Sequence, residues 1–321
     1  PNYSYQLRIF LNNGDGTFAQ GITSVTNTLG EILTGDFNKD TYKDIAIMGF
    51  YGKLLVFQGK GDGSFSGPTE VTIGDSLTII DSISADFNRD GIIDIAATVI
   101  YRGYELTKVV LLTGNGDGTF QAPKVLISEI LDTEKLSVLV GLAAEDINMD
   151  GIPDILVSTS GHGDYPSGLA VLIGDGSGGF LRKPDFEFNL DIDYLPIRVK
   201  DFNGDGIPDI ALQGYSKVYI LIGNGDETFK YPMMFNISGN DLNTGDFDND
   251  GAEDLVSTRD HVFILFARGD GTFIDRKETS VIKGPSKTLL SADFDGDTRP
   301  DIVISEERGF LFSTTMNNGN E

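Results

Sequence analysis

The chain contains no cysteine, no tryptophan and only two histidines. Without cysteine there is no disulfide framework and no thiol chemistry. Basic residues are also scarce, since 24 lysines and arginines face 49 aspartates and glutamates, for a formal net charge of −25. Nucleic acids and anionic membranes both attract clustered basic side chains. The charge therefore predicts no nucleic-acid partner and no binding to an anionic membrane surface.

Long apolar runs and familiar catalytic motifs are missing as well. No stretch approaches the length of a membrane-spanning helix, so we expect no membrane insertion. The sequence has no nucleophile elbow, metalloprotease helix or phosphate-binding loop. Its two histidines, His162 and His261, lie far apart in the chain, and its carboxylates follow a metal-binding pattern. We therefore expect no catalytic residues and a protein that is not an enzyme.

Aspartate and glycine, in contrast, recur at fixed spacing. The stretch 201–209 reads DFNGDGIPD, with Asp or Asn at the first, third, fifth and ninth positions and Gly at the sixth. Side-chain oxygens at alternate positions of a tight loop converge on one point, as a hard cation such as Ca²⁺ requires. Glycine at the sixth position allows the chain to turn sharply there. The apolar run that follows, at 210–212, predicts that the loop leads directly into a buried strand.

Five related acidic loops occur elsewhere in the chain, so the pattern is a repeat. They lie at 36–44, 86–94, 146–154, 246–254 and 293–301. Repetition at this period is typical of solenoids and propellers. The loops are not EF-hands, because none has the bidentate Glu that an EF-hand carries at position twelve. Thr41 and Thr298 replace the sixth-position glycine in the first and last loops, so their turns and metal affinities are less secure.

A second motif, a Gly-rich turn, alternates with the loops. It reads GNGDGTF at 114–120, recurs in six full copies between 12–18 and 267–273, and ends incompletely at 316–321. Gly, Asn and Asp supply the positive φ angles of tight hairpins, so we interpret the aspartates of these turns as turn formers. Short apolar or β-branched runs flank both motifs and predict four strands per repeat. An all-β propeller of four-stranded antiparallel blades is the expected fold.

Together, the acidic loop, the strand after it and the GNGDGTF-type turn resemble the FG-GAP/VCBS repeats of integrin-α-type β-propellers. The resemblance covers nearly the whole chain. It implies a calcium-stabilised ring, and up to six Ca²⁺ between the first and second strands of the blades. It also implies side-chain ligands at positions one, three, five and nine and a main-chain carbonyl ligand at position seven. These positions hold Asp36, Asn38, Asp40, Tyr42 and Asp44; Asp86, Asn88, Asp90, Ile92 and Asp94; Asp146, Asn148, Asp150, Ile152 and Asp154; Asp201, Asn203, Asp205, Ile207 and Asp209; Asp246, Asp248, Asp250, Ala252 and Asp254; and Asp293, Asp295, Asp297, Arg299 and Asp301.

The sequence is compatible with two numbers of blades, six and seven. We count six first, six second, seven third and six fourth strands, 25 in all. Six blades leave one strand over and seven leave three missing, so the first-strand count favours six and family habit favours seven. The strand pair within residues 1–28 has no acidic loop of its own. We expect it to complete the ring or to be donated to a neighbouring subunit, which would build a filament or another homo-oligomer.

The leading functional hypothesis is a calcium-binding propeller for adhesion or structural assembly, outside the cell or at its surface. Repeated calcium loops favour this location because calcium is plentiful there. Surface loops, including the insertions at 101–108, 129–140 and 160–168, would bind protein or glycan partners. A lectin-like, carbohydrate-binding propeller is the alternative. A propeller belonging to a polysaccharide-degrading enzyme is the third hypothesis.

Overall fold

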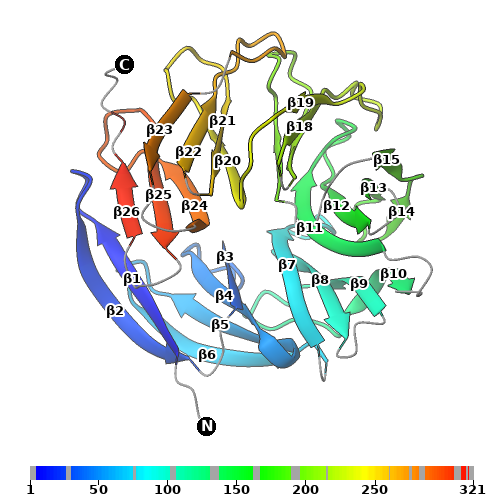
Figure 1. Ribbon diagram of the computed structural model, residues 1–321. Helices are drawn as coiled ribbons and strands as arrows, with labels where there is room; N and C mark the ends of the chain where they lie inside the picture. The colour runs from blue at the N-terminus through cyan, green and yellow to red at the C-terminus, as the bar shows by residue number, and fades with distance from the viewer. Residues whose placement is uncertain are drawn as a thin grey trace. The chain divides into compact units, whose positions relative to one another are not determined.

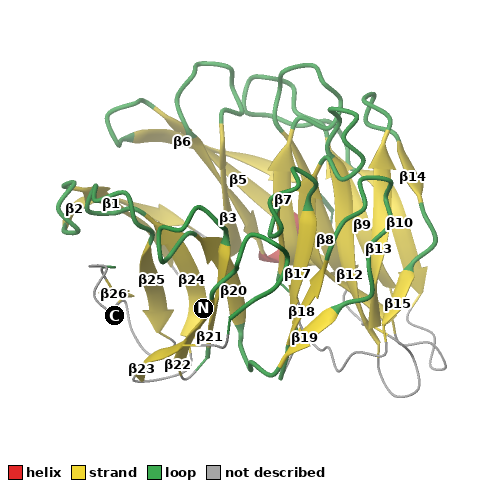
Figure 2. Cartoon of the chain, turned by 90° about the horizontal axis from the view of Figure 1, so that it is seen from above, coloured by secondary structure: helices red, strands yellow, loops and turns green. Residues whose placement is uncertain are grey.

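The computed structural model describes most of the chain. The described residues are 5–26, 30–74, 77–101, 106–130, 137–161, 167–188, 196–214, 216–259, 261–274, 277–281, 286–306, 312–315 and 317. Within them lie 26 strands and a single short 3-10 turn, η1 (Phe50–Gly52) (Figure 2). The all-β fold class predicted from the sequence is confirmed.

Contacts separate the chain into two compact units. The first unit comprises residues 1–11, 20–146 and 151–189, and the second comprises 12–19, 147–150 and 190–321. In each unit the strands form antiparallel meanders, in which strands consecutive in sequence lie side by side (Figure 1). A single domain over residues 1–321 stays a prediction.

Three large sheets and most of a two-stranded ribbon make up the first unit. The ribbon strands are β1 (Tyr5–Asn12) and β2 (Phe18–Thr26). The sheets run in the orders β3-β4-β5-β6, β7-β8-β9-β10 and β11-β12-β13-β14, with β15 also paired to β13. Their strands are β3 (Gly30–Gly35), β4 (Asp44–Gly49), β5 (Lys53–Gly59), β6 (Phe65–Thr72), β7 (Leu77–Ala85), β8 (Asp94–Tyr101), β9 (Leu106–Leu112), β10 (Lys124–Ile130), β11 (Ser137–Glu145), β12 (Asp154–Gly161), β13 (Ser167–Gly174), β14 (Phe180–Arg182) and β15 (Phe186–Phe188).

The second unit holds three further sheets. Their orders are β16-β17-β18-β19, β20-β21-β22-β23 and β24-β25-β26 among the described residues. Their strands are β16 (Ile197–Lys200), β17 (Asp209–Gln213), β18 (Val218–Leu221), β19 (Met233–Phe235), β20 (Asp241–Gly245), β21 (Asp254–Thr258), β22 (His261–Leu265), β23 (Lys277–Val281), β24 (Ser286–Ala292), β25 (Asp301–Glu306) and β26 (Phe312–Thr315).

These strands agree with the sequence prediction except at one place. All six predicted first strands, β3, β7, β11, β16, β20 and β24, begin separate sheets. The described strands number 26 rather than the predicted 25 because one fourth strand is divided into β14 and β15. Pro184 lies in the gap between them, and proline cannot donate to the ladder of a strand. The middle parts of the insertions predicted at 101–108, 129–140 and 160–168, namely 102–105, 131–136 and 162–166, fall outside the described residues.

The core is formed by the second and third strands of each sheet. In β17 all five residues are buried. In β8, Ile95 and Ala97 belong to one apolar cluster with β4 and β5, while Ala96 belongs to another with β12 and β13. Alternate side chains of one strand therefore fill two different spaces between sheets. This explains why these strands read as continuous apolar runs.

Phenylalanine stands at the second position of five of the six loops, and Ile147 takes this position in the third. Phe87 is fully buried, and its ring meets that of Phe180 edge-to-face, in the Gly-rich turn of the next repeat, with centroids 5.8 Å apart. Phe37 contacts Phe120 in the same way, at 5.8 Å. Burying such a ring contributes about 1.5–3 kcal/mol. In these two repeats the ring of the acidic loop therefore packs against the Gly-rich turn of the next repeat.

The ribbon turn takes part in this pattern in the second unit. Phe18, at the end of the first Gly-rich turn, meets Phe294 of the sixth loop at 5.5 Å. Gly16 N–H and Asn12 Nδ2 both donate to the Phe294 carbonyl oxygen, at 3.2 and 2.9 Å. In the first unit, the side chain of Leu7 on β1 packs against an apolar cluster that includes Ile45. Ring completion or strand donation by residues 1–28 stays a prediction.

Candidate metal centres

The first aspartate of every acidic loop caps its own loop. One of its carboxylate oxygens accepts the N–H of the sixth residue in all six loops, at 2.7–2.9 Å. In the second loop, the other oxygen of Asp86 accepts the N–H of Asp90 at 3.1 Å. These bonds wrap the backbone around the carboxylate and fix the direction in which the loop turns.

The third and fifth residues are bonded to each other as well. In the second loop, Asn88 Nδ2 donates to Asp90 Oδ2 at 2.9 Å, and Asn88 Oδ1 accepts the Asp90 N–H at 3.0 Å. The Asp90 carboxylate also accepts the N–H of Ile92 at 2.7 Å. The same Asn-to-Asp contact occurs in the first, third and fourth loops. Oxygen atoms of positions one, three and five are therefore gathered on each of these loops.

Two loops bring carboxylates especially close. Among the described residues, groups of three have oxygens that all lie within 4.8 Å of one another. These groups are Asp246, Asp248 and Asp254, and Asp293, Asp295 and Asp297. Burial and the neighbouring Asp250 carboxylate raise the pKa of Asp248 above its ordinary value. Carboxylates at this separation repel one another until a cation or protons neutralise them.

The donor set fits a hard divalent cation. It consists of carboxylate and amide oxygens, without the imidazole or thiolate ligands that favour zinc. Calcium accepts six to eight such oxygens in flexible geometry. The side chains at positions one, three, five and nine would hold the ion, and its positive charge would offset the repulsion between their carboxylates. Ligation by the main chain at position seven stays a prediction.

The ninth aspartate has a second task that the sequence did not reveal. In all six loops this residue is fully buried, at 0 % exposure. Asp209 Oδ2 accepts the Phe202 N–H at 2.9 Å, and its Oδ1 accepts the Gly223 N–H at 2.8 Å. Asp94 and Asp254 make the corresponding two bonds. The ninth aspartate therefore clamps the acidic loop to the start of the Gly-rich turn.

Burial makes the charge of this clamp costly. It raises the pKa of Asp209 to about 6 and that of Asp254 to about 7, although two backbone N–H bonds lower each value. The pKa of Asp94 is raised to about 6 for the same reason. A bound cation in contact with such a carboxylate would favour its ionised form.

Loop and turn approach closely where glycine stands at the first turn position, whereas the turn at 267–273 has Ala267 there. A Cβ atom on Gly223 would lie 2.3 Å from the Pro208 carbonyl oxygen, and one on Gly114 would lie 2.5 Å from that of Ile93. The sixth loop position has a left-handed backbone in every loop, with φ from 75° to 92°. Thr41 and Thr298 adopt the same conformation at φ 75°, so the turn is kept and the threonines carry the strain.

The Gly-rich turns contain aspartates of another kind, and these are turn formers as predicted. Asp117 Oδ1 accepts both the N–H and the hydroxyl of Thr119, and these bonds lower the pKa of Asp117. Asp270, within the Arg-Gly-Asp sequence at 268–270, makes the same bonds with Thr272. Their oxygens are used locally, in the form of an Asx-type turn.

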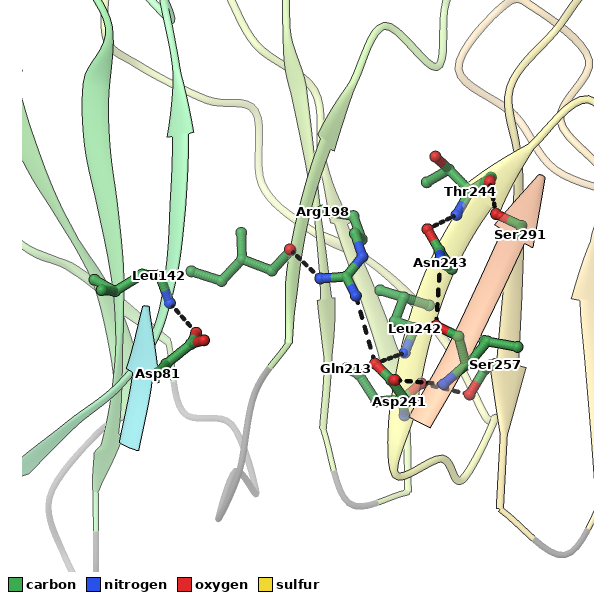
Figure 3. A network of polar contacts seen from close by, with 12 residues as sticks. Asp81, Leu142, Arg198, Gln213, Asp241, Leu242, Asn243, Thr244, Ser257 and Ser291 are labelled. Atoms are coloured by element: carbon green, nitrogen blue, oxygen red, sulfur yellow. Dashed lines mark hydrogen bonds and ion pairs between the residues drawn. The ribbon is translucent and has the colours of Figure 1, made fainter. Parts of the chain in front are cut away.

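The first strands carry a set of acidic residues whose contacts were not predicted from the sequence. They stand five residues before the first loop aspartate, at Glu31, Asp81 and Asp241. Asp81 Oδ2 accepts the Leu142 N–H on β11 at 2.6 Å, and Asp241 Oδ2 accepts the Leu289 N–H on β24 at 2.9 Å (Figure 3). Each carboxylate thus bonds to the first strand of the following sheet.

In the sequence, these acidic residues share only their position in the repeat. The reason for their contacts is found in the strands that they bond to. The accepting strands are irregular where they are contacted, with register shifts at Leu139/Leu142 and Ser286/Thr288. A β-bulge leaves an N–H without its ladder partner, which a carboxylate of the neighbouring sheet can satisfy. Arg198 Nη2 reaches Asp241 Oδ1 at 3.5 Å in the second unit (Figure 3).

Glu31 meets a carboxylate rather than a cation. The Ser82 hydroxyl donates to Glu31 Oε2 at 2.8 Å, and Asp81 lies close enough to share a proton with Glu31. The residue is exposed on one side, but protein replaces part of the water around its carboxyl group. This desolvation and the Asp81 charge raise the pKa of Glu31 to about 8. Among the described residues, Asp81 and Ser82 are the groups that act on the Glu31 carboxyl.

We expect replacement of Glu31 by glutamine to flatten the pH dependence of stability. Between the ordinary pKa of 4.5 and the folded value of about 8, the folded chain holds a proton that the unfolded chain releases. The free energy of unfolding therefore falls as pH rises through this range. Melting curves at pH 5, 7 and 8.5 should show a steeper loss in wild type than in Glu31→Gln. Glu70→Gln, at an exposed ion pair with Lys53, is the control, and parallel curves for wild type and Glu31→Gln would contradict the assignment.

Neither histidine adds a catalytic constellation to the described residues. His261 begins β22 and its ring contacts that of Phe263 at 6.0 Å. His162 lies outside the described residues. The described residues contain no helix long and apolar enough to cross a membrane.

Known proteins with similar sequence and structure define the class. A lectin of Agrocybe aegerita, described as recognising non-reducing terminal N-acetylglucosamine specifically, superposes with a TM-score of 0.62 at 20% identity, covering 91% of this chain and 78% of its own. BBS1N, solved in complex with ARL6DN, gives a TM-score of 0.59 at 12% identity, covering 88% and 78%. No curated protein sequence matches the chain. With its four-stranded antiparallel meanders, the chain has the fold of a β-propeller.

The family follows from the repeats themselves. The model of the FG-GAP-like repeat matches residues 36–97, 146–212, 201–257 and 246–304, which together span more than half of the chain. Each match begins at the first aspartate of an acidic loop. The protein belongs to the FG-GAP-like repeat family, and the resemblance found in its sequence is confirmed.

Proposed function

We propose that the protein is a non-enzymatic, calcium-stabilised propeller that binds glycans. The observation that carries this proposal is the similarity to the Agrocybe aegerita lectin, which extends over 91% of the chain. That lectin is described as recognising a non-reducing terminal N-acetylglucosamine. A terminal sugar of a glycan is therefore the class of ligand proposed for this chain.

Two tyrosines at the same repeat position are the proposed sugar contacts. Tyr51 and Tyr101 stand fifteen residues after the first aspartate of their loops and are 58 % and 38 % exposed. Aromatic faces with a polar tip suit the apolar face and hydroxyl rim of a sugar ring. Tyr51 also has a left-handed backbone, φ 65° and ψ 27°, a conformation that costs about 1–3 kcal/mol and is typical of functional sites. Lys108 Nζ lies 4.6 Å from the centre of the Tyr101 ring.

The proposed glycan edge is opposite to the calcium loops. β4 begins at the last loop residue, Asp44, and ends at Gly49, immediately before the turn that holds Tyr51. Six residues of strand span roughly 20 Å. Calcium would therefore act on the far end of each sheet, as a structural ion that fixes the strands, and would not contact the sugar.

Glycan-array binding tests this function directly. Wild-type protein should bind structures with exposed terminal sugars, and Tyr51→Ala and Tyr101→Ala should each weaken that binding about 5- to 150-fold, since a stacked ring contributes about 1–3 kcal/mol by analogy with base stacking. Tyr231→Ala is the matched control, because Tyr231 is 87 % exposed but stands at another repeat position. Silence across a broad array, or equal loss in the control, would contradict the proposal.

A second candidate function is adhesion or structural assembly outside the cell. It is favoured by the ribbon turn, which docks on Phe294 as a Gly-rich turn without an acidic loop of its own. A turn of this kind is suited to exchange between molecules. Extracellular calcium would keep weak loops occupied, which supports the same location for both candidates. Electron microscopy separates them, because filaments indicate exchange and single particles exclude it.

A further inference from the structure

The fourth residue of each acidic loop has a left-handed backbone, and in two loops it is basic. Lys39 and Arg89 have φ values of 63° and 60°. Met149 and Asn249 adopt the same conformation in the third and fifth loops, so the loop sets it and fixes the direction in which each side chain leaves the backbone. Lys39 and Arg89 belong to the first unit.

Lys39 reaches into the next repeat. Its Nζ donates to the Asp90 carbonyl oxygen in the second loop, at 3.3 Å. A Cβ atom on Gly91 would lie 3.9 Å from this ammonium, and one on Gly116 would lie 3.6 Å from Lys39 Cδ. The lysine therefore lies between the acidic loop and the Gly-rich turn of the following repeat, where both present glycine.

Arg89 repeats the arrangement one sheet further on. Its Cδ lies 3.3 Å from the place of a Cβ on Gly176, in the Gly-rich turn of the third repeat. Its Nη2 lies 4.0 Å from the place of a Cβ on Gly151, in the third acidic loop. Gly151 and Gly176 occupy the same repeat positions as the two glycines beside Lys39. Two successive junctions thus have a basic side chain at the same place, lysine in the first and arginine in the second.

The loops of the second unit receive no such cation from the loop before them. The fourth residue of the loop is Gly204 in the fourth loop, which comes before the fifth, and Asn249 in the fifth loop, which comes before the sixth. These two loops also contain four aspartates each, against three in each of the other loops. Their carboxylate oxygens form the groups gathered within 4.8 Å. The fifth loop, which also contains Glu253, is the most acidic of the six, although Lys200 Nζ lies 4.0 Å from Glu253 Oε1; the sixth loop contains a cation of its own, Arg299, with Nη1 4.0 Å from Asp297 Oδ2.

We propose that Lys39 and Arg89 act as built-in cations that join consecutive repeats of the first unit without metal. A fixed positive charge beside an acidic loop offsets the repulsion of its carboxylates and weakens the attraction of that loop for a divalent ion. The second and third loops are therefore less dependent on calcium for their folded structure. Calcium dependence is concentrated in the loops at 246–254 and 293–301.

Hydrogen exchange of the full chain, followed by mass spectrometry in calcium and in chelator, tests this inference. In chelator, amides of 246–257 and 293–304 should exchange at least about tenfold faster than in calcium, as a loss of about 1.4 kcal/mol in local stability implies. Amides of 86–97 should change less than threefold. Equal acceleration in all loops, or no acceleration in any loop, would overturn the proposal. This measurement does not depend on glycan binding, so its result is independent of the proposed function.

Charge-removing variants complete the test. Lys39→Met and Arg89→Met keep an unbranched side chain of the type that Met149 provides at this position in the third loop. In chelator they should accelerate exchange in 86–97 and 151–161 respectively, while calcium restores wild-type protection. Lys39→Arg should behave as wild type, and so should Lys60→Met, which removes an exposed charge from a Gly-rich turn. Unchanged protection of 86–97 in Lys39→Met would refute the tether.

Discussion

Replacing Asp209 by alanine is expected to lower the free energy of unfolding by about 3–5 kcal/mol. The side chain is fully buried, and its two oxygens accept the N–H groups of Phe202 and Gly223. Alanine leaves both donors buried without partners, and each such group costs about 1–3 kcal/mol. The loop and the Gly-rich turn would lose their direct connection at the same time. Urea unfolding in the presence of chelator measures the effect of these bonds separately from metal binding.

Two further variants assign this loss to the clamp. Asp226→Ala removes an exposed aspartate from the neighbouring turn and should cost about 1 kcal/mol or less. Asp209→Asn keeps one acceptor oxygen but turns an amide donor toward a backbone donor. It should lie between wild type and alanine. A cost below about 1 kcal/mol for Asp209→Ala would show that the two backbone bonds contribute little.

Removal of calcium is expected to lower the melting temperature by roughly 10 °C. A ligand that binds only the folded state contributes about 2.7 kcal/mol per site when its free concentration is 100 times its dissociation constant. One kcal/mol shifts the melting temperature of a domain of 150–250 residues by about 2–4 °C. Several occupied loops therefore produce a large shift, and the carboxylates at Asp246, Asp248 and Asp254 lose their neutralising charge.

Calorimetry in 1 mM calcium, in chelator and in 1 mM magnesium checks this result. Magnesium prefers a smaller, octahedral site and should restore only part of the stability. Asp248→Asn should reduce the calcium-induced shift, since it removes a charge but keeps an oxygen at position three. A melting temperature that chelator leaves unchanged would contradict a structural role for calcium.

The repeat explains why so much of the fold was predictable. The acidic loop and the Gly-rich turn are local motifs, and their hydrogen bonds join residues two to five positions apart, as between Asp86 and Gly91. Local bonds of this kind depend on residue type and order, which a sequence displays directly. The first strands were placed correctly because every copy of the motif marks the same point in a sheet.

Contacts between repeats were not predictable in the same way. Asp81 bonds to Leu142, 61 residues away, because a β-bulge in β11 leaves an N–H group for it. Gly141 within β11 is compatible with a bulge, but the local sequence does not name Asp81 as the partner of the Leu142 N–H. The bonds from the ninth aspartate to the Gly-rich turn were not predicted either. Aspartate is expected at this position as a metal ligand, so the sequence gives no separate indication of the clamp.

The docking of the ribbon turn on Phe294 has a consequence for biosynthesis. Asn12 and Phe294 are separated by 282 positions, so the first of them leaves the ribosome long before the second. At 5–20 residues per second, the interval is roughly 15–55 s. Throughout that time the nascent chain carries an aromatic side chain, Phe18, whose partner has not been made. The ribbon turn therefore makes one of the last contacts of these repeats to form, and protection of this turn by a chaperone would matter most before the sixth repeat emerges.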